Sequence, residues 1–144
     1  MKNTKYEISD YKANTPLKKW ICLKSKGILD LYGISKTTIC FSEKKEKIND
    51  FNGSVAVFSV NYNKIYKTIN LNIYEVANQM WTQGNKEVLL HSLIHEFAHV
   101  LTTDIANAAL SRHVTKKDVI DRVEELTESI AIMARELYNL KNIN

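Results

Sequence analysis

The hydrophobic positions of this 144-residue chain begin with a stretch of helical spacing. Thr15-Pro16 is typical of a helix start, because proline is well tolerated at the first helical position, and Gly33 is typical of a helix end. Apolar residues recur between them at Leu17, Trp20, Ile21, Leu23, Ile28, Leu29 and Leu31. This pattern predicts one helix between Pro16 and Gly33, weakened in its middle by Gly27.

Shorter runs with strand character follow this helix. Residues 37–41 and 54–60 are rich in β-branched and aromatic side chains, and the charged residues 44–52 between them predict a turn. Residues 66–73 alternate strictly between apolar and polar, which is typical of a half-buried strand at a sheet edge. We expect 66–73 to pair antiparallel with 54–60 through a turn at 61–64.

The helical period returns after Gly84-Asn85, where Asn85 is a natural N-cap. The apolar positions of this helix are Leu89, Leu90, Leu93, Ile94, Phe97, Ala98 and Leu101. A last helix is predicted from about 117 to 141, with an apolar face along Val119, Val123, Leu126, Ile130, Met133, Ala134 and Leu137. One helix, a small antiparallel-containing sheet and two further helices make a single α+β domain over residues 1–144, in which we expect the polar residues 1–14 to form a mobile arm.

Composition and charge narrow the class of protein. Hydrophobic residues make up 44% of the chain and charged residues 25%, as in ordinary globular proteins. The sequence shows neither a secretory signal nor an apolar run of membrane-spanning length, so we expect a soluble cytoplasmic protein with Cys22 and Cys40 as free thiols. The net charge of +4 divides into +7 for residues 1–72 and −3 for residues 73–144. Because the lysines are scattered, we expect neither a nucleic-acid nor a membrane partner, and the oligomeric state stays open.

The segment His95-Glu96-Phe97-Ala98-His99 carries the candidate chemistry. His95 and His99 are four residues apart, so on a helix they share one face, where both imidazoles can bind one tetrahedral zinc ion. Glu96 lies about 100° round the helix and can there take a proton from a zinc-bound water and hand it to the leaving group. Inside a buried helix these three polar residues would be costly without a metal.

A catalytic zinc site needs a third protein ligand. Position 105 is isoleucine, which excludes the metzincin spacing, and the surroundings of Cys40 lack a peptide-deformylase motif. His113 follows a turn and could reach the metal, although a surface histidine is commoner. The final helix offers a better candidate, because Glu124 lies about 100° from the Val123 direction and points inward.

Two more glutamates of the final helix lie close to Glu124 in the sequence. Glu128, about 140° from the Val123 direction, can orient a ligand histidine or act as the ligand itself, whereas Glu125 near 200° faces solvent. His91 precedes His95 by four residues and shares the metal-facing stripe. We expect His91 to be a hydrogen-bonded structural residue.

The motif, followed by a glutamate on a later helix, resembles the gluzincin branch of zinc metallopeptidases, including small members encoded by phages and prophages. The resemblance covers residues 85–140 at most. Glu124 fits the pattern of a third ligand followed by a small residue, Thr127, and an acidic one, Glu128, whereas Glu128 with Ala131 fits the looser Glu-x-x-Ala form. The resemblance therefore implies zinc held by His95, His99 and Glu124, with Glu128 as the alternative third ligand.

The resemblance also implies how substrate is handled. An edge strand before the metal helix, here 66–73, would bind the substrate backbone by strand addition. A residue outside the motif would stabilise the oxyanion, with Tyr74, Arg112 and His113 as candidates. The sequence thus predicts a zinc-dependent peptidase acting on a peptide or protein, with Glu96 as the base. The alternatives are a non-peptide amidase and a catalytically silent, zincin-like binding or regulatory protein.

Overall fold

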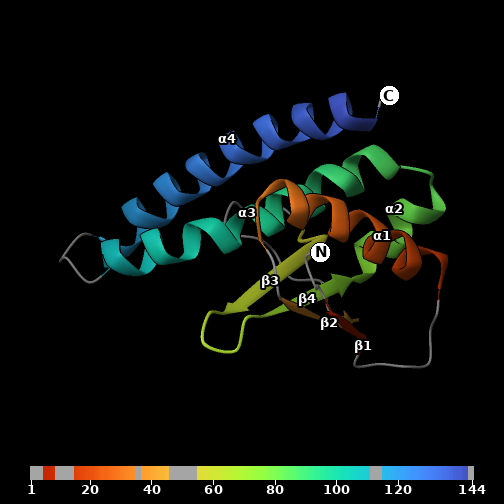
Figure 1. Cartoon of the computed structure of the whole chain (residues 1–144), viewed down its shortest axis with the longest axis horizontal. Helices are drawn as coiled ribbons and strands as arrows, with labels where there is room; N and C mark the ends of the chain where they lie inside the picture. Colours follow the sequence, from red (N-terminus) through yellow and green to blue (C-terminus); the bar gives the residue numbers. More distant parts are fainter. Residues whose placement is uncertain (1–4, 9–14, 35–36, 46–54, 111–114, 143–144) are drawn as a thin grey trace.

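The computed structural model describes residues 5–8, 15–34, 37–45, 55–110 and 115–142 (Figure 1). Its elements are β1 (Lys5–Ile8), α1 (Pro16–Leu31), β2 (Thr38–Lys44), β3 (Phe58–Asn63), β4 (Thr68–Tyr74), α2 (Glu75–Thr82), α3 (Lys86–Leu110) and α4 (Lys116–Asn142). The predicted α+β class is confirmed, with α2 as an additional helix. Lys5–Ile8 forms a strand paired with β2, so the expectation of a mobile arm is wrong for these residues.

Helix α1 begins and ends where the sequence predicts. The Thr15 hydroxyl accepts a hydrogen bond from the Lys18 backbone N–H at 3.3 Å, and Gly33 follows the last turn with a φ of +71°. A Cβ atom on Gly27 would come within 3.1 Å of the Tyr138 ring of α4. The glycine that weakens the helix therefore permits the close approach of α1 and α4.

The sheet has the strand order β1-β2-β4-β3, in which β1, β2 and β4 are parallel and β3 is antiparallel to β4. The predicted antiparallel pair is present, but β4 is an interior strand and β3 is the edge. The prediction of an edge at 66–73 is therefore wrong. The turn also lies later than expected, at 64–67, because the Asn63 side chain accepts hydrogen bonds from the N–H groups of Ile65 and Tyr66, both at 3.1 Å.

The core lies between the sheet and the helices, which gather on one side of it (Figure 1). Alternate residues of the interior strands point into this layer and meet the apolar side of α3. The largest fully buried members are Ile39, Phe41, Ile69, Leu71, Ile73, Leu89, Leu93, Ile94 and Phe97. Each such side chain contributes about 1.5–3 kcal/mol by leaving water, so the backbone of α3 is firmly anchored.

Helix α4 lies against the outer side of α3, and the face it turns inward overlaps only in part with the one predicted. The buried residues are Val119, Thr127, Ala131 and Ala134, of which Val119 and Ala134 belong to the predicted face, whereas Leu126, Met133 and Leu137 remain 40%, 59% and 53% exposed. The hydroxyls of Thr102 and Thr127 are hydrogen-bonded at 3.0 Å across this contact. The small side chains of Thr127, Ala131 and Ala134 let α3 and α4 approach closely, and the centre of the packed face lies about 55° from the predicted one.

None of the helices that the structure describes is both long and apolar enough to cross a membrane.

Candidate metal centre

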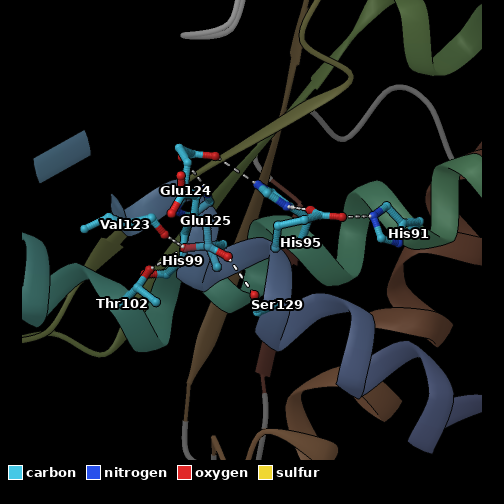
Figure 2. Close-up of polar contacts among 10 residues, drawn as sticks. His91, His95, His99, Thr102, Val123, Glu124, Glu125 and Ser129 are labelled. Carbon is cyan, nitrogen blue, oxygen red and sulfur yellow. Dashed lines mark hydrogen bonds and ion pairs between the residues drawn. The ribbon is translucent and has the colours of Figure 1, made fainter. Parts of the chain in front are cut away.

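Helix α3 presents a stripe of three histidines towards α4 (Figure 2). His91, His95 and His99 follow one another at four-residue intervals, so their side chains lie one above another on the same face. The rings of His95 and His99 have centroids 5.0 Å apart and meet edge to face at 75°. Because the opposite side of α3 is buried in the core, the stripe has a fixed position.

Glu124 of α4 meets the two histidines of the motif (Figure 2). Its Oε2 lies 3.4 Å from His95 Nε2, and its Oε1 lies 3.1 Å from His99 Nε2. One ligand atom from each of the three residues lies within 4.8 Å of the others. The structure thus brings together the three residues that the sequence nominated as metal ligands.

Glu128 lies one turn further along α4 and bridges two histidines. Its Oε2 accepts a hydrogen bond from His95 Nδ1 at 2.5 Å, and its Oε1 accepts one from His91 Nε2 at 2.8 Å. The bond to Nδ1 fixes the His95 ring and leaves Nε2 directed at Glu124. Glu128 is therefore placed to orient His95, and His91 has the hydrogen-bonded role expected from its place on the stripe.

The close charges shift the acid–base equilibria of the cluster. Burial alone would lower the pKa of His95, but its hydrogen bonds to Glu124 and Glu128 raise it to about 9. Hydrogen bonds from His95 and His99 lower the pKa of Glu124 to about 2. Burial raises the pKa of Glu128, but the hydrogen bonds from His95 and His91 outweigh burial, so the pKa is lowered on balance. The metal-free cluster is therefore a network of carboxylates and protonated imidazole.

The pKa of Glu96 is raised, in contrast to those of Glu124 and Glu128. Burial raises the pKa of its carboxyl group to about 7, against the lowering effect of His99 and His95. The backbone N–H of Val60 in β3 donates a hydrogen bond to this carboxylate. Near neutral pH, Glu96 can therefore be populated both with and without a proton.

Glu96 and the cluster line a cleft of about 260 Å³. One wall consists of His91, Ser92, His95, Glu96 and His99 of α3 with Glu124 of α4, and the other is the segment Val55, Ala56, Val57 and Phe58 that leads into β3. A second hollow along α4 is lined by His95, Asp121, Glu124, Glu125, Glu128 and Ser129. Its carboxylates raise the local concentration of cations around the site.

Comparison with known proteins assigns no family to this arrangement. No protein-family model matches the chain, and neither a curated protein nor a solved structure matches it. The chemistry of the site is therefore read from its donors. Two imidazole nitrogens and one carboxylate suit zinc or another transition metal, whereas calcium and magnesium prefer oxygen ligands alone.

The remaining candidates of the sequence lie elsewhere. The Tyr74 hydroxyl is hydrogen-bonded to that of Ser59 at 3.0 Å and does not line the cleft. Cys40 is half-buried on β2 and is not a member of the three-residue cluster. Arg112 and His113 lie outside the described residues. No sequence pattern predicted the cleft wall at 55–58 or the contact between Val60 and Glu96. Both depend on how the edge strand packs over α3.

Proposed function

We propose that this protein is a zinc-dependent peptidase similar to the gluzincins. The observation that carries the proposal is the convergence of ligand atoms from His95, His99 and Glu124 within 4.8 Å, with Glu96 beside them in one cleft. Two histidines and one glutamate are a ligand set of hydrolytic zinc sites, which keep a further position open for water or substrate.

The donor residues fit zinc in their chemistry and in their support. The Nε2 atoms of His95 and His99 both face Glu124, while the Nδ1 atom of His95 is held by Glu128. Carboxylates commonly hold zinc-binding histidines in this way, because the bond fixes the tautomer and the ring orientation. When bound, zinc would polarise the scissile carbonyl and lower the pKa of the attacking water.

Glu96 would act as general base and then as general acid. A carboxyl group with a pKa of about 7 can take a proton from the attacking water and return it to the leaving amine at neutral pH. Its position next to His95 in the helix keeps it at the site without making it one of the three converging ligands. The Val60 N–H restricts the orientation of its carboxylate.

An extended peptide is the substrate class that the cleft favours. The Val57 carbonyl accepts a hydrogen bond from Tyr74 N–H, so alternate residues of β3 bond to β4 and those between turn their backbone groups to the free edge. Phe58 is one of the residues whose backbone groups face the free edge, and it also lines the cleft. Strand addition at β3, in place of the interior strand β4, would hold a peptide across the cluster.

The proposal is tested by comparing wild type with Glu96→Gln, both loaded with zinc, on a library of internally quenched fluorescent peptides. We expect wild type to cleave members of the library, and Glu96→Gln to keep its zinc while cleavage falls by about 10²–10⁴-fold. Glu87→Gln is the matched control, since Glu87 is an exposed glutamate of the same helix whose side chain is 90% exposed.

Undiminished cleavage by Glu96→Gln would rule out Glu96 as the base. Zinc-loaded wild type that cleaves no member of the library would contradict the peptidase and favour the silent binding or regulatory protein.

A further inference from the structure

Helix α4 carries an apolar stripe that is separate from the face it packs on α3. The stripe consists of Leu126, Ile130, Met133, Leu137 and Leu140, whose spacing alternates between four and three residues. Met133, Leu137 and Leu140 are 59%, 53% and 62% exposed, and Leu126 is 40% exposed. This alternation is the seam of a coiled coil, in which a second helix covers the apolar positions.

The stripe continues into a groove between the C-terminal part of α3 and the N-terminal part of α4. The groove has a volume of about 320 Å³ and is lined by Ile105, Ala109, Asp118, Val119, Arg122, Val123 and Leu126. Ile105 is 53% exposed. Ile105 and the exposed members of the stripe offer apolar surface to a partner, and a stable association buries roughly 800 Å² on each side.

The charged residues beside the stripe can pair between two copies of α4. Arg122 and Glu136 are exposed on the same flank of α4, and Ser129 lies midway between them in the sequence. They are separated by about 21 Å along the helix, so they cannot pair within one chain. In two antiparallel copies of α4 that cross at Ser129, each Arg122 would face Glu136 of the other copy. Such a match about a two-fold axis is the signature of an isologous contact.

We propose that α4 is a homodimerisation surface, on which a second copy of the chain packs its own α4 antiparallel about Ser129. The C-terminal residues of each stripe then cover the groove at the N-terminal end of the other. Glu124 lies about 160° round the helix from the centre of the stripe, so the dimer leaves the metal centre open. The proposal does not depend on the chemistry of that centre.

The test is analytical ultracentrifugation of the full chain over a wide range of concentration. We expect twice the chain mass for wild type, and the mass of one chain for Met133→Lys and Leu137→Lys. Ile65→Lys is the matched control, because Ile65 is 86% exposed in the turn between β3 and β4, and this variant should remain a dimer. Circular dichroism and zinc content of the lysine variants should match those of wild type.

Charge reversal tests the orientation independently of the apolar contact. Arg122→Glu and Glu136→Arg should each raise the dissociation constant about tenfold, since two symmetric pairs become repulsive, and the double variant should restore it. A monomeric wild type, or lysine variants that still associate, would contradict the assignment of α4 as the dimer surface. A double variant that associates as weakly as either single variant would overturn the antiparallel arrangement.

Discussion

At the scale of single residues, Glu128 organises the candidate centre although it is not one of the three converging ligands. Both of its oxygens are used, one by His95 Nδ1 and one by His91 Nε2. His91 Nε2 is the donor in its bond to the carboxylate, which can only accept, and His91 Nδ1 is buried with no hydrogen-bond partner among the described residues. The chain His91–Glu128–His95 therefore connects a residue outside the cluster to a ligand.

Replacing Glu128 should weaken metal binding without abolishing it. We expect Glu128→Gln to lower the zinc affinity by about 10–100-fold, because the amide cannot accept hydrogen bonds from both histidines with a carboxylate's strength. The measurement is competition with a chromophoric chelator. Glu125→Gln, three residues earlier in the same helix, is the control and should bind zinc as wild type does. An affinity unchanged in Glu128→Gln would contradict the orienting role.

Metal binding should depend on pH through His95. In the metal-free protein its pKa of about 9 lies above the ordinary value of 6.5, so the ring is protonated at neutral pH and must lose that proton to bind metal. The apparent zinc affinity should therefore fall about tenfold for each pH unit below about 9. Calorimetry in buffers of different ionisation enthalpy should detect the released proton. Binding that is independent of pH in this window would contradict the protonated state.

At the scale of elements, the contact between α3 and α4 decides where Glu124 lies. The sequence predicted both helices and the inward direction of Glu124, because helix periodicity can be read without tertiary information. It placed the packed face only partly, since Val119 and Ala134 are buried as predicted, whereas Thr127 and Ala131 are buried in place of the larger apolar residues, which form a stripe of their own. Hydrophobicity alone cannot distinguish a face that packs within the chain from one left for another helix.

A larger residue in this contact should disturb both stability and the metal centre. Ala131 is fully buried against α3, so Ala131→Leu should lower the free energy of unfolding by about 1–3 kcal/mol and reduce zinc affinity by moving Glu124. Urea unfolding measures the first effect and chelator competition the second. Ile132→Leu, a neighbouring change at an exposed position, should alter neither. Equal stability and equal zinc affinity in the two variants would contradict this prediction, because the contact between α3 and α4 would then tolerate the larger side chain.

At the scale of the whole molecule, the sheet edge and the helix pair come together at the cleft. The sequence predicted an antiparallel pair of strands but not that β3 would be the edge, because strand order depends on pairing between distant segments such as β2 and β4. His95, Glu96, His99 and Glu124 could be nominated from spacing. The opposite wall at 55–58 and the Val60 contact could not, since they exist only once the strand lies over α3.

The central claim is that His95, His99 and Glu124 hold a zinc ion, and elemental analysis tests it most directly. Purified wild type and His99→Ala would be analysed side by side, after incubation with zinc salt and removal of free metal. We predict about one zinc ion per chain in wild type and almost none in the variant, which keeps only two of the three ligands. Wild-type protein that holds no zinc after this treatment, or a variant that holds as much as wild type, would contradict the account.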